Sequence, residues 1–175
     1  AIQLAHSGRK GSAKQPWKGG TPLESNFLDS EQSPWNTIAP SAIPLSEGWQ
    51  KPTEMNIKSI KKLIQDYVSA AKRAVSAGFQ IIEIHAAHGY LIHSFMSPIS
   101  NKRDDEYGGS HIGRIKLLKE IITEIRKEIP DEVPIFCRIS AIDGLKDGWN
   151  IEDSINLSKT LINIGVDVID CSSGG

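Results

Sequence analysis

Residues 79–90, FQIIEIHAAHGY, carry the clearest evidence for the fold class of this chain. The first seven of these residues form a short apolar run rich in isoleucine, which predicts a buried β-strand. The run ends at the polar ring of His85, and those of His88 and Tyr90 follow within five residues. A buried strand that ends in polar side chains is typical of parallel α/β proteins, because their functional residues lie at the carboxyl ends of the strands.

The residues on either side of this strand predict helices. Upstream, apolar residues recur every three or four positions between Asn56 and Gly78, which predicts an amphipathic helix that ends at the glycine. Downstream, the same spacing runs through residues 118–129, where Pro130 stops it. Residues 134–140 then predict a second strand.

The same pattern occurs once more towards the end of the chain. Asn150 is placed to cap a third helix that Gly165 ends, and residues 166–171 predict a further strand. With residues 2–6 (IQLAH) counted as a strand, the order is β, long loop, α, β, α, β, α, β. Such alternation predicts a parallel sheet with right-handed crossovers, either doubly wound or a (β/α)8 barrel.

Two observations favour the barrel. No strand is followed by GxGxxG or GxxxxGK[ST], the phosphate-binding loops that are usual in nucleotide-binding open sheets. Polar residues also gather where the strands end, as on the catalytic rim of a barrel. They are Gln3, His6, His85, His88, Arg138, Ser140 and residues 171–173.

We therefore expect an α/β chain that is part of a (β/α)8 barrel. A complete barrel takes roughly 250 residues and eight strands, so this single domain of 175 residues is expected to be a fragment with about four βα units from the middle of the barrel. Residues 56–175 carry the αβαβαβ units. Residues 7–52, rich in Gly, Pro, Ser and Trp, are too long for a passive connection, so we expect a lid or covering loop near the site.

The composition excludes several classes of function. The chain is 39% hydrophobic and 23% charged, with a net charge of -1 and no tract of Lys or Arg, which argues against a nucleic-acid or membrane-surface partner. No segment approaches the roughly 20 apolar residues of a membrane span. Cys137 and Cys171 lie in apolar, strand-like runs, so we expect reduced thiols and a cytoplasmic location.

The polar cluster at residues 85–90 allows three interpretations. As metal ligands, His85 and His88 lack the glutamate of an HExxH motif and an obvious third ligand. As catalytic groups, the two imidazoles polarise a carbonyl oxygen while Tyr90 delivers a proton. In the third interpretation, the three side chains only satisfy nearby backbone groups.

Five blocks of the sequence resemble one family, in the same order. They are QLAHSGRK (residues 3–10), PSAIP (40–44), IEIHAAHGYLIHSFMSPISNKRDDEYGGS (82–110), FCRIS (136–140) and DVIDCSSGG (167–175). Together they span the chain and are similar to the NADH:flavin oxidoreductases of the Old Yellow Enzyme type. The form HAAHGY resembles the branch of small bacterial-type ene-reductases and NADPH dehydrogenases.

The resemblance implies a flavoenzyme and a role for each matching residue. Gln3 and Arg138 would contact the ring of FMN, and His85 and His88 would hold the carbonyl oxygen of the substrate. Tyr90 would protonate the α carbon. NAD(P)H would reduce the flavin, and an α,β-unsaturated carbonyl compound would then be reduced in a ping-pong reaction, by a protein that is a possible homo-oligomer at full length.

Two other functions are weighed against this one. The chain as it stands would be a non-catalytic fragment or degenerate barrel that cannot retain flavin, or it would be a metal-dependent barrel lyase that uses the histidines. The family also commonly has Pro-Glu-Asn where His111, Ile112 and Gly113 stand here. That departure bears on local loop stability rather than on flavin chemistry.

Strand alternation adds one expectation about charge. Every second side chain of a strand faces the same side, so Glu83, Arg138 and Asp170 are expected on the inner face of the barrel. Because desolvating an isolated charge costs several kcal/mol, we predict that Arg138 pairs with Glu83 or Asp170.

Overall fold

The computed structural model describes residues 1–23 and 33–174. Its main sheet has four parallel strands in the order β1-β4-β5-β6. Their bounds are β1 (Ile2–Leu4), β4 (Ile82–Ala86), β5 (Ile135–Ser140) and β6 (Val168–Ser172). Helices α1 (Ile57–Ser76), α4 (Lys116–Glu128) and α5 (Ile151–Ile162) connect successive strands. The alternation read from the sequence is confirmed.

Helix boundaries follow local capping chemistry. The Asn56 side chain accepts a hydrogen bond from the Ser59 backbone N–H at 2.8 Å and so starts α1. Asn150 forms a reciprocal capping box with Asp153 at the start of α5. Both caps satisfy N–H groups that have no partner within the helix, which is why these two boundaries were readable from sequence.

Two strands begin later than predicted, for one shared reason. The predicted strand at residues 79–85 starts only at Ile82, because the Phe79 N–H bonds back to the Ala74 carbonyl and closes α1. The Val166 N–H likewise bonds to the Leu161 carbonyl and closes α5, so β6 starts at Val168. In each case the residue after a left-handed glycine belongs to the helix end.

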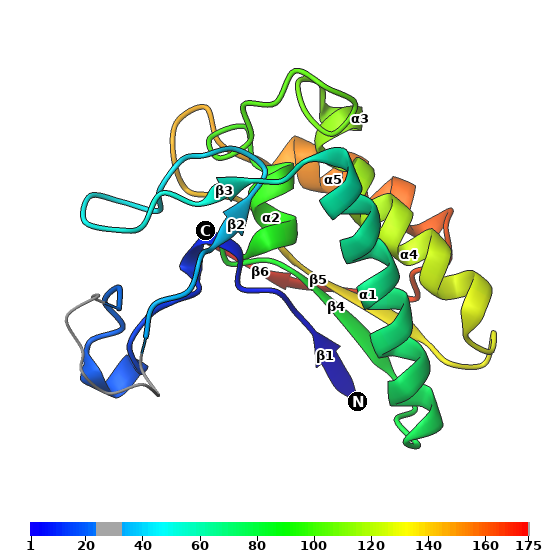
Figure 1. Cartoon of the computed structure of the whole chain (residues 1–175). Helices are drawn as coiled ribbons and strands as arrows, with labels where there is room; N and C mark the ends of the chain where they lie inside the picture. The colour runs from blue at the N-terminus through cyan, green and yellow to red at the C-terminus, as the bar shows by residue number, and fades with distance from the viewer. Residues whose placement is uncertain (24–32, 175) are drawn as a thin grey trace.

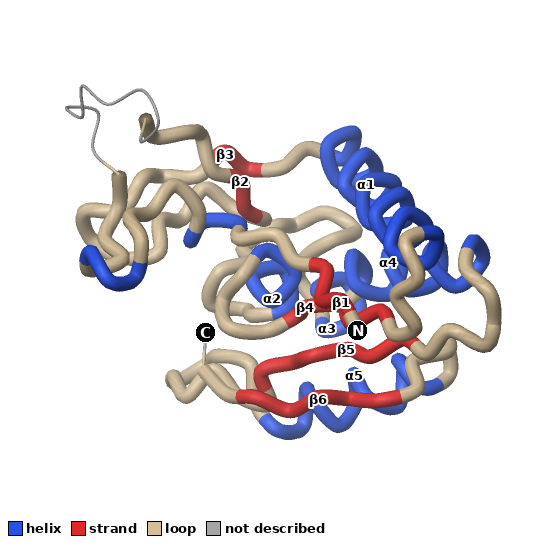
Figure 2. Tube along the Cα trace, turned by 90° about the horizontal axis from the view of Figure 1, so that it is seen from below, coloured by secondary structure: helices blue, strands red, loops and turns tan. Residues whose placement is uncertain are grey.

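The two faces of the sheet differ in burial, as the alternation predicted. Figures 1 and 2 show α1, α4 and α5 along one face, and the side chains pointing towards them, such as Ile84 and Cys137, are fully buried. On the other face the side chains of Arg138 and Asp170 are 36% and 42% exposed. The polar face is thus accessible.

Two short helices lie between β4 and β5. They are α2 (Leu91–Met96), whose residues are all buried, and α3 (His111–Arg114), which the Ser110 side chain caps. The run DEYGGS before α3, residues 105–110, forms the preceding loop and ends in the capping residue Ser110. The His111 ring stacks on Trp149 at 5.3 Å between centroids, and its Nδ1 lies 2.9 Å from an Asp153 oxygen. This contact secures the loop where the sequence departs from the family pattern.

The segment expected to form a lid, residues 7–52, is partly regular. It contains the 3-10 turns η1 (Gly8–Lys10) and η2 (Pro16–Lys18), and β2 (Ile38–Ala39), which pairs in parallel with β3 (Thr53–Glu54) just after it. Residues 24–32 of the expected lid lie outside the described residues. The turn η1 packs directly on α2, since a Cβ on Gly8 would lie 2.9 Å from the Leu91 Cα. A covering role for the segment stays a prediction.

Candidate active site

The two predicted histidines meet at the carboxyl end of β4. His85 is the fourth residue of this strand and is 5% exposed, and His88 follows in the turn before α2. His85 Nε2 lies 3.3 Å from His88 Nδ1, and the two rings are nearly perpendicular. His88 Nε2 in turn lies 2.6 Å from the Ser172 hydroxyl at the end of β6. The sequence-predicted pair is therefore brought together.

These contacts fix the tautomers of both neutral rings. The Ala87 backbone N–H donates to His85 Nδ1 at 3.1 Å, so the His85 proton is on Nε2 and faces His88 Nδ1. His88 then carries its own proton on Nε2 and donates it to Ser172. Each imidazole thus holds one N–H, and both are engaged within the protein. A carbonyl oxygen that accepts both protons has to replace His88 Nδ1 as the acceptor for His85 and the Ser172 hydroxyl as the acceptor for His88.

Burial keeps both imidazoles neutral at neutral pH. Desolvation is the largest cause of a lowered pKa at His85, which falls to about 4, and the nearby His88 and Arg138 add to it. Desolvation, followed by the charges of Arg138 and Lys10, also lowers the pKa of His88. A neutral imidazole donates one hydrogen bond without carrying charge, as the polarisation of a carbonyl requires.

Tyr90 lies against this pair. Its ring centroid is 4.9 Å from that of His85, and the residue precedes the first turn of α2 without capping it through its side chain. The ring is half-buried. Its phenol stays close enough to the histidines to serve the same bound molecule.

Arg138 lies beside the histidines on the inner face of the sheet. Strand register pairs it with His85 on one side and with Asp170 on the other. Arg138 Nε lies 3.3 Å from an Asp170 carboxylate oxygen, which confirms the predicted ion pair, although the two atoms are not aligned as a hydrogen bond. Among the described residues the guanidinium has no hydrogen-bond acceptor, and because its Nε is buried towards Asp170, its two terminal nitrogens are the donors left for a ligand.

Gln3 and Glu83 form a second inner-face pair, one register row away. The Gln3 amide nitrogen donates to a Glu83 carboxylate oxygen at 2.7 Å. Glu83 is therefore matched by an amide, which leaves Asp170 as the partner of Arg138. Gln3 also lines an apolar groove of about 570 Å³ between β1 and α1, whose lining includes His6 but not His85, His88 or Arg138. This groove lies apart from the polar cluster.

An anionic planar ring fits the donor set of the inner face. Arg138 offers a half-exposed cation with unsatisfied donors, and Gln3 offers an exposed amide on the same face. Reduced FMN is such a group, because reduction places negative charge on its ring edge. Within the described residues, no three His, Cys, Asp or Glu side chains are grouped to hold a metal ion.

Sequence reasoning missed several residues that shape the site. Lys10 donates to the His88 carbonyl oxygen at 2.7 Å, and the His88 N–H donates to the Ser140 hydroxyl at 2.9 Å. His88 itself has a left-handed backbone, with φ of 59°. Ser140 and Ser172 were visible as polar residues at strand ends, but only the register of three strands shows that they meet His88.

Comparisons with known proteins identify the family of the chain. The whole chain, residues 1–175, matches the NADH:flavin oxidoreductase / NADH oxidase family. It is 48% identical over 173 residues to the NADPH dehydrogenase of Bacillus velezensis, covering 99% of this chain and 45% of that protein. It is 44% identical over 188 residues to NADH:flavin oxidoreductase FG08077 of Gibberella zeae, covering 99% and 44%.

Solved structures give the same result. The old yellow enzyme homologue from Zymomonas mobilis superposes with a TM-score of 0.75 at 28% identity, over 99% of this chain and 47% of that one. The predicted fold class is confirmed, and the chain forms part of a (β/α)8 barrel. It spans less than half the length of the relatives named here. Among the described residues, the structure contains no helix of the length and apolarity that a membrane crossing requires.

Proposed function

Because the chain belongs to the NADH:flavin oxidoreductase / NADH oxidase family, we propose that it supplies the substrate-binding half of an FMN-dependent ene-reductase. The family is one of oxidoreductases, with FMN as cofactor and NAD(P)H as reductant. The proposal adds the substrate class, activated alkenes such as enones, and the roles of the individual residues. The cytoplasmic location and the possible homo-oligomer stay predictions.

One observation carries the proposal. A pair of neutral imidazoles and a guanidinium with free donors lie in neighbouring positions of one sheet face, since register pairs His85 directly with Arg138. An enone needs hydrogen bonds at its carbonyl oxygen, and a reduced flavin needs positive charge near its ring. The two requirements are met side by side.

Each side chain then has a definite task. His85 and His88 donate their Nε2 protons to the carbonyl oxygen, which takes the place of the His88 Nδ1 and Ser172 Oγ acceptors. This polarisation makes the β carbon of the alkene electron-poor. Tyr90, next to His85, gives its phenolic proton to the α carbon and recovers one from solvent. Arg138 and Gln3 would hold FMN, which when bound supplies the hydride that NAD(P)H delivers.

The test is a spectroscopic titration of the purified protein. After incubation with FMN and removal of the unbound flavin, flavin absorbance is expected to remain with the protein, to bleach anaerobically with NADPH, and to return on addition of 2-cyclohexenone. Cyclohexanone, which lacks the C=C bond, is the matched control and should leave the flavin reduced. A colourless protein overturns the proposal in favour of a chain that does not retain flavin, and stoichiometric metal without flavin favours the lyase.

A further inference from the structure

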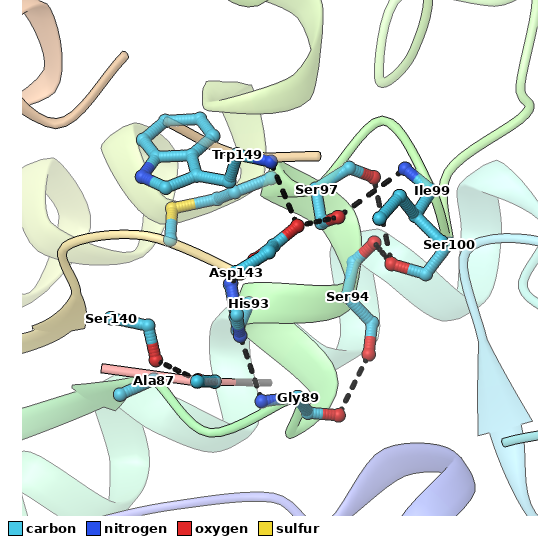
Figure 3. A network of polar contacts seen from close by, with 12 residues as sticks. Ala87, Gly89, His93, Ser94, Ser97, Ile99, Ser100, Ser140, Asp143 and Trp149 are labelled. Atoms are coloured by element: carbon cyan, nitrogen blue, oxygen red, sulfur yellow. Dashed lines mark hydrogen bonds and ion pairs between the residues drawn. The ribbon is translucent and has the colours of Figure 1, made fainter. Parts of the chain in front are cut away.

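A buried histidine–carboxylate contact lies behind the histidine turn, on the first turn of α2. His93 Nε2 lies 2.8 Å from an Asp143 carboxylate oxygen, and the two side chains are 1% and 5% exposed. His93 comes from α2 and Asp143 from the loop after β5. Figure 3 shows the pair at the centre of a polar network that joins these two segments. The roles assigned to the other site residues leave it unused.

The network fixes which nitrogen of His93 carries a proton. The Gly89 backbone N–H donates to His93 Nδ1 at 2.7 Å, so this nitrogen is an acceptor. The proton is therefore on Nε2, which lies 2.8 Å from an Asp143 carboxylate oxygen, although the two atoms are not aligned as a hydrogen bond. His93 can present an acceptor to Gly89 only in this tautomer, and Asp143 is the group that selects it.

Asp143 is held as a carboxylate by its own partners. One of its oxygens accepts hydrogen bonds from the Ser97 hydroxyl at 2.6 Å and from the Trp149 N–H at 2.8 Å. Burial opposes ionisation, but the close contact with His93 and the hydrogen bonds from Ser97 and Trp149 keep the pKa of Asp143 below its usual range. Arg9 is the other charged group nearby, and burial lowers its pKa although the negative charge of Asp143 opposes that shift.

The backbone that this pair holds is the turn that carries His88. His88 and Gly89 both have left-handed backbones, with φ of 59° and 68°, a conformation that a histidine adopts only under constraint. All four polar backbone groups of the two residues are bound by side chains of other residues. These side chains are Ser140 and Lys10 at His88, and His93 and Ser94 at Gly89.

We propose that His93 and Asp143 are positioning residues, which hold the His88–Gly89 turn and thereby place the imidazole of His88 for the substrate. This inference rests on the substrate-binding role proposed for His88. The carboxylate sets the His93 tautomer, His93 accepts from Gly89, and the turn presents His88 to His85. Neither His93 nor Asp143 touches the substrate.

The test compares Asp143→Asn with Ser97→Ala by amide hydrogen exchange and histidine nitrogen NMR. In Asp143→Asn, the oxygen of the amide faces Ser97 and Trp149, so its NH₂ group faces His93. The ring then has to accept at Nε2 and carry its proton on Nδ1, opposite the Gly89 N–H. Gly89 exchange is expected to speed up by about tenfold or more, as loss of one buried hydrogen bond predicts. Ser97→Ala, which leaves the His93 contact intact, should change it much less.

A second pair of variants keeps the inference testable if Asp143→Asn does not fold. His93→Asn retains an acceptor near the position of Nδ1, whereas His93→Phe has none. Slower Gly89 exchange in His93→Asn than in His93→Phe supports the role, and equal rates overturn it. Equal effects of Asp143→Asn and Ser97→Ala on Gly89, with an unchanged His93 tautomer, also overturn it.

Steady-state kinetics separate this inference from the proposed function. In flavin-loaded Asp143→Asn, the KM for 2-cyclohexenone should rise by about tenfold, the equivalent of one lost hydrogen bond, while the rate of flavin reduction by NADPH stays the same. If Gly89 exchanges faster in Asp143→Asn but the KM is unchanged, the turn does not place His88 for the substrate, and this part of the inference is overturned. If the wild-type protein holds no flavin, the exchange and NMR results still decide whether the pair holds the turn, and only the proposed function fails.

Discussion

His88 Nε2 donates to the Ser172 hydroxyl across 2.6 Å, so the imidazole proposed to bind substrate is held by the far strand of the sheet. The hydroxyl occupies the direction in which a substrate oxygen would accept. Ser172 therefore competes with the substrate for one proton.

The first prediction follows from this competition. Ser172→Ala leaves the His88 N–H without an acceptor, so the KM for enones should fall by roughly twofold to tenfold, the equivalent of 0.5–1.5 kcal/mol. Ser140→Ala is the matched control, since Ser140 binds the backbone of His88 rather than its ring, and it should raise the KM. A higher KM in both variants contradicts the competition.

The second prediction concerns the charge of Arg138. Asp170→Asn should make the flavin midpoint potential less negative, because the guanidinium loses its counter-charge and stabilises the reduced anionic ring more strongly. Both side chains are more than a third exposed, so the free energy of unfolding should change by less than about 1 kcal/mol. Glu83→Gln, whose native partner is Gln3, should shift the potential less, and an equal shift would remove the special role of Asp170.

The third prediction is a pH dependence of stability. The pKa of His85 is about 4 in the folded protein and near 6.5 in the unfolded chain, so only the unfolded state binds this proton between those values. The free energy of unfolding should therefore fall as the pH falls from 6.5 towards 4, by about 2 kcal/mol at pH 5. The lowered pKa values of His6 and His88 act in the same direction.

Urea denaturation at pH 7 and pH 5 measures this dependence. In His85→Gln the free energy of unfolding should differ less between pH 7 and pH 5, because the titrating group is absent. An NMR titration that gives His85 a pKa near 6.5 in the folded protein would show that burial does not lower its pKa.

The fourth prediction isolates the proton donor. Tyr90→Phe keeps the ring that packs on His85 and removes the hydroxyl, so reoxidation of the flavin by an enone should slow by about a hundredfold or more. Flavin reduction by NADPH should not change, since no proton reaches carbon in that step. Stopped-flow measurement of the two half-reactions distinguishes the effects, and equal slowing of both would contradict the assignment.

Much of this architecture was predictable because it follows local rules. Asn56 and Asn150 cap helices where their sequence positions indicate, and strand alternation placed Arg138 on the same face as Glu83 and Asp170, one of which is its partner. Which of these two carboxylates pairs with Arg138 was not predictable. The outcome depends on Gln3, which lies 80 positions before Glu83 and donates a hydrogen bond to it.

The second layer of the site escaped prediction for a similar reason. His93 lies in the apolar run LIHSFM, and Asp143 lies in a polar loop 50 residues later, with no spacing that links them. Only the folded chain brings α2 against that loop. The left-handed backbone of His88 was also invisible, because sequence patterns assign such a conformation readily only to glycine.

A crystal structure of the protein with FMN and an enone bound would show directly where both molecules lie. We expect the flavin ring on the inner face of the sheet, within hydrogen-bond distance of Arg138 and Gln3. We expect the enone oxygen within hydrogen-bond distance of Nε2 of both His85 and His88. A flavin bound away from Arg138, or an enone oxygen held by other groups while His88 stays on Ser172, would contradict these expectations.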